Sequence, residues 1–207
     1  MVLDPGHGGA DAGARGPSGV LEKDVTLHFA LAARAELEKQ NFRVVLTRER
    51  DENPSFDDRA ALANSQRHAV FLTLHVSSTG PAGTARAYYL GLPGAAPQPS
   101  RATQAAAKSE KNEWVRWEEA QFPFLAASRR LAELIQAQLR QSVGGSPEEP
   151  GAAWLRQLRP VAAPAVAVEV SSVAVARREQ LERMAPAVAT AMVRAVAEFR
   201  SAEGAGH

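Results

Sequence analysis

Residues 1–7, MVLDPGH, pass from a short apolar run directly into a turn that carries a histidine. We predict a buried strand over residues 1–4, because short apolar runs bounded by Gly and Pro are typical of buried strands. Two later stretches are similar: residues 69–75, AVFLTLH, end on a histidine, and residues 165–170, AVAVEV, carry a glutamate near their end. Each of these predicted strands therefore ends close to a side chain that can bind a metal or move a proton.

Helical segments separate the predicted strands. The expected elements, in chain order, are a helix at 23–40, a strand at 42–47, a helix to about 65, a strand at 85–90, a long helix ending near 141 and a last helix at about 177–200. Asn41 is a plausible end of the first helix, and Asp57 or Asp58 would cap the second. Strands that alternate with helices predict an α/β fold, a three-layer single domain with a mostly parallel central sheet flanked by helices.

The chain is expected to form one domain. Its 207 residues, of which 45% are hydrophobic, suffice for one substantial core. We assign residues 1–200 to this domain and residues 201–207 to a frayed tail. Residues from about 91 to 120 would interrupt the domain as an insertion or mobile segment, because 91–109 are poor in large apolar side chains and rich in Pro, Ala and Ser.

Composition narrows the classes of function. Lys and Arg number 24 against 23 Asp and Glu, so the net charge of +1 gives no reason to expect nucleic acid as a partner. The lack of cysteine excludes disulfides, thiolate nucleophiles and Cys-based zinc sites. No stretch approaches the roughly 20 apolar residues that span a bilayer. The start has no signal-peptide features, so we expect either a cytosolic protein or, as we favour, a domain of an exported precursor whose signal peptide lies outside this sequence.

The strand ends define a candidate site. In open α/β sheets, ligands bind beyond the carboxyl ends of the strands, where His7, His75 and Glu169 would meet. Glu22 follows a Gly-rich loop at the start of a helix and can fold over the same edge, although a glutamate in that position is ambiguous. Two imidazoles and one carboxylate suit a catalytic Zn²⁺, which takes three protein ligands and keeps a position for water. Glu169, a carboxylate within an apolar run, needs a compensating partner and could transfer protons.

Taken singly, each of these residues could be structural, and their joint placement is what favours a site. We expect His28 and His68 to be structural or surface residues.

Five blocks of sequence then occur in a characteristic order. They are residues 2–11 (VLDPGHGGAD), 21–24 (LEKD), Leu46-Thr47-Arg48 with Asp51, Arg59 and Ala63-Asn64, 72–75 (LTLH) and 164–170 (PAVAVEV). In order and spacing they resemble the zinc-dependent N-acetylmuramoyl-L-alanine amidases, a family that cleaves peptidoglycan and includes cell-division enzymes. The resemblance covers nearly the whole chain apart from about 91–120.

The resemblance implies a site and a reaction. One Zn²⁺ would be held by His7, Glu22 and His75, with Glu169 as the catalytic carboxylate. The enzyme would hydrolyse the amide between the lactyl group of N-acetylmuramic acid and L-alanine of the stem peptide. Zinc-activated water would attack, and Glu169 would act as general base and then as general acid. The resemblance also implies peptidoglycan as the partner and a periplasmic or cell-wall location.

Two flanks of the expected site depart from the family pattern, at Val76-Ser77-Ser78 and at 171–174, SSVA. They affect the expected substrate contacts more than catalysis. Two alternatives therefore stay open: a peptidoglycan-binding module without turnover, and a zinc peptidase that acts on other cell-wall peptides.

The segment at about 91–120 is unmatched. Some cell-division members carry an insertion there, whose helix covers the active site until an activator protein displaces it. Trp114 and Trp117 could form such a cover, or they could only pack against the start of the long helix. The carboxylates that could reach the zinc are Glu110, Glu113, Glu118 and Glu119.

Overall fold

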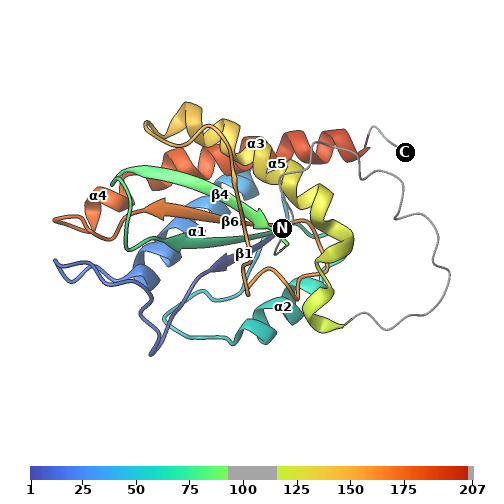
Figure 1. Cartoon of the computed structure of the whole chain (residues 1–207), viewed down its shortest axis with the longest axis horizontal. Helices are drawn as coiled ribbons and strands as arrows, with labels where there is room; N and C mark the ends of the chain where they lie inside the picture. The colour runs from blue at the N-terminus through green and yellow to red at the C-terminus, as the bar shows by residue number, and fades with distance from the viewer. Residues whose placement is uncertain (93–115, 205–207) are drawn as a thin grey trace.

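The computed structural model describes residues 1–92 and 116–204, and within them a six-stranded sheet forms the centre of the molecule (Figure 1). Its strands are β1 (Val2–Pro5), β2 (Val45–Leu46), β3 (Phe71–Val76), β4 (Thr84–Leu90), β5 (Gly151–Ala153) and β6 (Ala165–Ser171), in the order β2-β1-β3-β6-β4-β5. β2, β1, β3 and β6 are parallel, whereas β4 runs antiparallel to β6, and β5 runs parallel to β4. The predicted α/β fold with a mostly parallel sheet is confirmed.

Helices cover both faces of this sheet. They are α1 (Glu22–Lys39), α2 (Phe56–Asn64), α3 (Leu125–Ser142), α4 (Glu179–Glu182) and α5 (Ala185–Gly204), with the short 3-10 turns η1 (Trp117–Glu119) and η2 (Phe122–Phe124). α1, α3 and α5 pack together on one face, and α2 lies on the other side of the sheet (Figure 1). Among the described helices, none is both long and apolar enough to span a membrane.

The two faces of β3 and β6 carry different side chains, because successive residues of a strand point to opposite sides. Leu72, Leu74 and Val76 of β3 belong to the larger apolar core, with α1, α3 and α5. Phe71 belongs to the smaller core, with Ala60 of α2. Residues 73, 75 and 169 share the face of the smaller core, so the candidate site lies on the side of the sheet where α2 packs.

The start of α2 corrects one prediction. The cap is Ser55 and not Asp57 or Asp58. The Ser55 hydroxyl accepts from the Asp58 backbone N–H, and the Asp58 carboxylate accepts from the Ser55 N–H, both at 3.1 Å. Asp58 therefore contributes as the distal half of a capping box.

Other boundaries also differ from the prediction. The expected strand at 42–47 is only the two-residue β2, and the three-residue β5 was not predicted. The expected last helix is divided into α4 and α5, and α5 continues to Gly204, inside the predicted tail at 201–207. α1 ends at Lys39 with Gln40 as its C-cap, and Asn41, the predicted stop, follows directly with a φ of 61°. The predictions for Glu110, Glu113 and Trp114 fall outside the described residues.

Candidate metal centre

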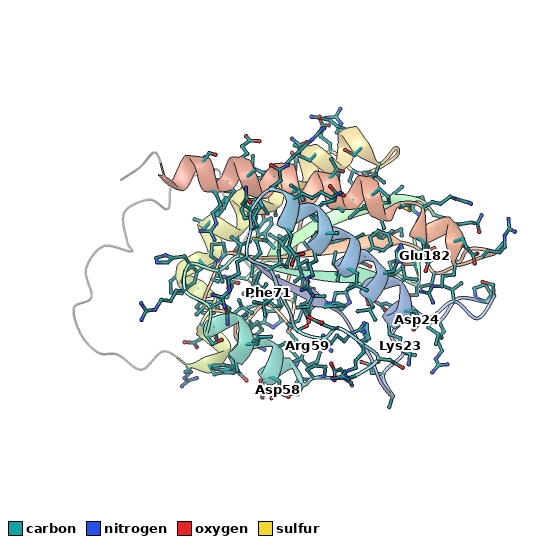
Figure 2. All side chains as sticks on the ribbon, turned by 180° about the vertical axis from the view of Figure 1, so that it is seen from behind. Lys23, Asp24, Asp58, Arg59, Phe71 and Glu182 are labelled. Atoms are coloured by element: carbon teal, nitrogen blue, oxygen red, sulfur yellow. The ribbon has the colours of Figure 1, made fainter. Side chains whose placement is uncertain are left out.

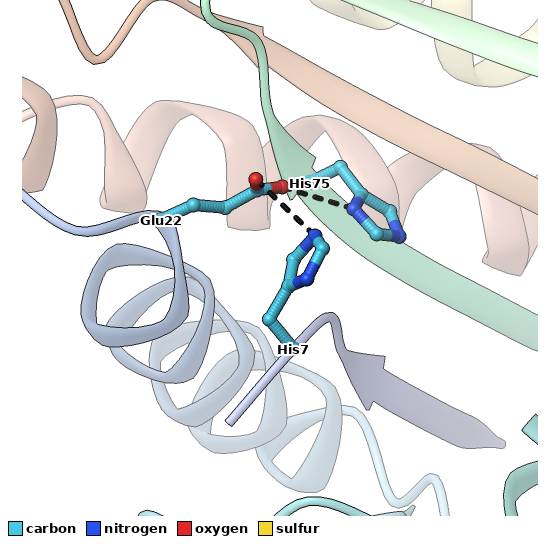
Figure 3. Close-up of side chains that lie close together, drawn as sticks. All are labelled: His7, Glu22 and His75. Atoms are coloured by element: carbon cyan, nitrogen blue, oxygen red, sulfur yellow. Dashed lines mark hydrogen bonds and ion pairs between the residues drawn. The ribbon is translucent and has the colours of Figure 1, made fainter. Parts of the chain in front are cut away.

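His7, Glu22 and His75 converge at one edge of the sheet (Figure 3). His7 follows β1, Glu22 is the first residue of α1, and His75 lies near the end of β3. One ligand atom from each residue lies within 4.8 Å of the ligand atoms of the other two. The structure thus brings together the three residues that the sequence analysis assigned to a metal.

Glu22 is the centre of this group and is 4% exposed. Its Oε1 accepts from the Val76 N–H at 2.8 Å and lies 2.9 Å from His75 Nδ1. Its Oε2 accepts from the Ala14 N–H at 2.7 Å and lies 3.2 Å from His7 Nε2. Burial raises the pKa of the Glu22 carboxyl, but the hydrogen bonds with His7 and His75 outweigh burial and hold the pKa well below its ordinary value.

His7 is held from two sides. Its Nδ1 lies 2.8 Å from the Asp11 carboxylate, so that Nε2 faces Glu22. The hydrogen bond with Glu22 raises the pKa of His7 to about 8, burial opposes this, and Asp11 adds to the rise. A histidine that donates its outer N–H to a carboxylate is a typical arrangement around metal-binding imidazoles, because it fixes the tautomer and the ring orientation.

Glycines allow these side chains to approach one another. A Cβ at Gly13 would lie 2.5 Å from Glu22 Oε2 and 2.6 Å from His7 Cδ2, and Gly13 has a φ of +64°. A Cβ at Gly6 would lie 2.5 Å from His75 Cε1. Part of the Gly-rich loop is therefore required by the packing of the centre itself.

The donor set fits a zinc ion. Tetrahedral Zn²⁺ with bonds of about 2.0–2.2 Å places its ligand atoms roughly 3.3–3.6 Å apart. The donors at His7, Glu22 and His75 lie within 4.8 Å of one another, and the two imidazoles lie 3.2 Å and 2.9 Å from the Glu22 carboxylate, close to that spacing. Two nitrogens and one oxygen also match the three protein ligands of catalytic zinc sites.

Glu169 lies beside this centre and not within it. It pairs with His75 in the register of β6 and β3, so both side chains project from the same face of neighbouring strands, about 4.8 Å apart. Its side chain is half-buried. Within the described part of the chain, its carboxylate has no hydrogen bond or ion pair, and across β6 it pairs in register with Arg86 of β4.

A pocket of about 440 Å³ opens next to the centre. His7 and His75 line it together with residues at and just before the start of α2, among them Asn53 and Phe56, and with Arg156 and Gln157. The imidazoles are therefore accessible to a ligand that enters from the side of α2.

The remaining predicted residues do not join the metal-type cluster of the described residues. Trp117 is 46% exposed, and its indole N–H donates to Asp57 of α2 at 3.2 Å. Glu118 pairs with Arg159 at 2.9 Å, and neither Glu118 nor Glu119 joins the metal-type cluster of the described residues. His28 and His68 are exposed, which confirms the surface prediction for them.

The two flanks that depart from the family pattern contact each other. The Ser77 N–H donates to the Val170 carbonyl, and the Val173 N–H donates to the Ser77 carbonyl, both at 2.9 Å. These segments follow β3 and β6 and form one rim beside the centre. Their contact is made through the backbone.

Sequence reasoning missed part of the site. Asp11, Arg48 and Arg59 occurred within the quoted blocks without any assigned role. Asp11 lies four residues after His7, and this spacing is the signal that could have identified it as the partner of the imidazole.

The family model described as N-acetylmuramoyl-L-alanine amidase matches residues 1–198. The chain belongs to this amidase family. A sporulation-specific N-acetylmuramoyl-L-alanine amidase of Bacillus subtilis is 43% identical over 85 residues, which are 40% of this chain and 33% of that protein. The amidase AmiC of Escherichia coli is 40% identical over 88 residues, which are 41% of this chain and 21% of that protein. The matches therefore span about a third or less of the length of these curated relatives.

Solved amidase structures share the fold. An N-acetylmuramoyl-L-alanine amidase from Clostridium difficile superposes with a TM-score of 0.71 at 23% identity, covering 97% of this chain and 95% of that one. The catalytic domain of CwlV from Bacillus (Paenibacillus) polymyxa gives a TM-score of 0.72 at 22% identity, covering 97% of both chains. The amidase fold thus accounts for nearly the whole of this chain.

Proposed function

We propose that this chain is a zinc-dependent hydrolase of the amide between N-acetylmuramic acid and L-alanine in peptidoglycan. The observation that carries the proposal is the convergence of His7, Glu22 and His75 on one point at the edge of the sheet. Membership of the amidase family indicates which bond is hydrolysed.

His7, Glu22 and His75 would hold the ion. When bound, Zn²⁺ supplies a Lewis acid that lowers the pKa of water and polarises the scissile carbonyl. Asp11 would keep the His7 ring turned so that Nε2 faces the ion, because Nδ1 donates to the Asp11 carboxylate.

Glu169 would move the proton. Its carboxylate accepts a proton from the attacking water and then donates it to the nitrogen of the leaving L-alanine, so that the C–N bond breaks and a neutral amine departs. Two facts support this role: Glu169 is in register with His75, and it has no competing partner within the described residues. A carboxylate bound in an ion pair would be less free to change its protonation state.

Location and partners are part of the proposal. We expect the chain to act on peptidoglycan outside the cytoplasm, as an exported periplasmic or cell-wall protein. The CwlD amidase of Clostridioides difficile, which shares the fold with a TM-score of 0.72 at 20% identity, was solved in complex with the GerS lipoprotein. An activator protein is therefore a reasonable partner to seek for this chain.

The test is hydrolysis of purified muropeptides by the protein with zinc and after chelation. Release of free stem peptide that is lost on chelation and restored by zinc would support the proposal. Equal release under both conditions would contradict zinc dependence.

Two other outcomes would favour the alternatives. Binding to cell-wall sacculi without cleavage, unaltered in Glu169→Ala, would indicate a binding module. Cleavage of stem peptides that lack the sugar would indicate a zinc peptidase.

A further inference from the structure

The turn that carries His7 has an unusual conformation. His7 has a φ of 62°, and Gly8 and Gly9 that follow it also have positive φ values. A residue with a side chain pays of order 1–3 kcal/mol for a sparsely populated backbone region, so the surrounding structure must maintain it. The backbone before His7 therefore needs strong external contacts.

Arg59 of α2 supplies one set of contacts. It is 5% exposed and is labelled in Figure 2. Its Nη1 donates to the Pro5 carbonyl at 2.8 Å, and its Nη2 donates to the carbonyl of His7 itself at 2.9 Å. The same Nη1 forms an ion pair of 2.6 Å with Asp4, which is 2% exposed, and this pair helps to fix the guanidinium.

Arg48, just after β2, supplies the second set. Its Nε donates to the Pro5 carbonyl at 2.9 Å and its Nη2 to the Gly6 carbonyl at 3.0 Å. The same Nη2 donates to the Lys23 carbonyl at 2.8 Å, in the first turn of α1, immediately after Glu22. Arg48 therefore joins the segment that carries His7 to the segment that carries Glu22.

Arg48 is unusual in how its charge is accommodated. It is 2% exposed, yet among the described residues it forms no ion pair, because its N–H groups donate to backbone carbonyls. Burying a cation without a counterion is costly, and an apolar residue is often at least as stabilising at a purely structural position. Its position is explained by the consecutive carbonyls of residues 5–7, which accept hydrogen bonds from Arg48 and Arg59.

We propose that Arg48 and Arg59 are positioning residues of the metal centre, which hold the backbone of residues 5–7 so that His7 and Glu22 are aligned before zinc binds. The inference rests on the zinc site of the proposed function. It requires guanidinium groups, since a planar fork can donate to several carbonyls at fixed angles and an ammonium is a single point of charge. Lysine at either position would keep the charge and lose the alignment.

The experiment measures zinc affinity without substrate, by competition of the purified protein against a chromogenic chelator. Arg48→Lys and Arg59→Lys are each expected to bind zinc about 10–100-fold more weakly, as is typical when a partner behind a ligand is lost. Arg34→Lys is the matched control, since Arg34 is a surface residue paired with Glu38 and Glu49, and its affinity should equal that of the wild type.

A second readout separates positioning from a loss of stability. Co²⁺ in place of zinc gives a visible spectrum that depends on coordination geometry, and we expect altered bands in both lysine variants at saturating metal. Wild-type affinity together with a wild-type spectrum in both lysine variants would overturn the inference.

Either variant could fail to fold, and a milder change covers that case. The Thr26 hydroxyl donates to the Gly6 carbonyl at 2.9 Å and accepts from Arg48 Nη2 at 3.1 Å. Thr26→Val keeps the shape and removes both bonds, so roughly tenfold weaker zinc binding is expected, at the lower end of the usual range. Unchanged affinity in folded Thr26→Val would overturn the inference even if the lysine variants do not fold. A wild-type protein that binds no zinc would instead contradict the proposed function.

Discussion

His75 and Glu169 occupy paired positions on neighbouring strands and face the same side of the sheet, but their side chains differ in their contacts. His75 contacts Glu22 at 2.9 Å, and Glu22 is held in turn by the backbone N–H groups of Ala14 and Val76. Glu169 has no hydrogen bond or ion pair within the described residues. The metal-type cluster is thus assembled in advance, whereas the adjacent carboxylate is left available.

The difference agrees with the roles proposed for the two residues. A metal ligand works best with one orientation and one protonation state, and hydrogen bonds enforce both. A general base must gain and lose a proton during turnover, so a strong partner for one protonation state would oppose the other. Changes at Glu169 should therefore affect rate alone, and changes around Glu22 should affect metal binding.

The largest expected effect is on turnover. Glu169→Gln should lower the rate of muropeptide hydrolysis by about 10²–10⁴-fold, because the amide cannot accept the proton of the attacking water. Zinc affinity and the free energy of unfolding should stay close to the wild type, since no contact of the carboxylate is lost. Glu36→Gln, at the surface, serves as the control. Retention of wild-type turnover in Glu169→Gln would remove Glu169 from the mechanism.

A smaller effect is expected from crowding the cluster. Gly13→Ala places a methyl group against Glu22 and His7 and should weaken zinc binding. The positive φ should also lower the free energy of unfolding by roughly 1–2 kcal/mol. Gly19→Ala is a matched control, because Gly19 has a φ of +84° and a Cβ added there would meet no other atom within 4 Å. It should lose similar stability and keep its zinc affinity; equal zinc affinities in the two variants would show that the cluster tolerates crowding.

The smallest effect is the pH dependence of the metal-free protein. The pKa of His7 is raised from 6.5 to about 8, so its stabilising contribution is complete below pH 6.5 and is lost as the pH rises through 8. The lowered pKa of Glu22 gives a contribution that is present above pH 4.5 and is lost as the pH falls below that value. Together they should stabilise the protein most between pH 4.5 and 6.5.

Urea unfolding with a chelator present, compared between wild type and His7→Gln, measures this contribution. The difference in unfolding free energy should shrink by on the order of 1 kcal/mol as the pH rises through 8. A difference that stays constant over the same range would mean that His7 is not protonated in the metal-free protein.

Much of the site was predictable from the sequence because apolar runs show where the strands end. His7 and His75 each follow an apolar run, and parallel pairing of β1 with β3 brings the ends of those runs together. Glu22 was much less predictable, since a glutamate at a helix start usually stabilises the helix dipole at the surface. Its burial depends on Gly13 and on the fold of the whole 8–21 loop, which no local pattern describes.

The errors in the predicted fold have similar causes. β5 consists of Gly151-Ala152-Ala153, which has no strand composition and is extended only because it pairs with β4 at the sheet edge. The reversal of β4 is also invisible in sequence, because a strand buried on one face has the same alternation in either direction. Ser55 was overlooked as a cap because two aspartates follow it closely.

The rim formed by Ser77 and Val173 has a consequence for how such a site can diversify. Its segments are joined by main-chain hydrogen bonds, but side chains also hold it: Val173 is 1% exposed in the larger core, and the Ser77 hydroxyl accepts from the Thr79 N–H at 3.0 Å. Mutation can therefore exchange the exposed neighbours Ser78 and Ala174 with the least disturbance of the ligands on the adjoining strands. Variation between relatives at these two positions, in nature or by design, would change the surface beside the centre and leave the metal-type cluster in place.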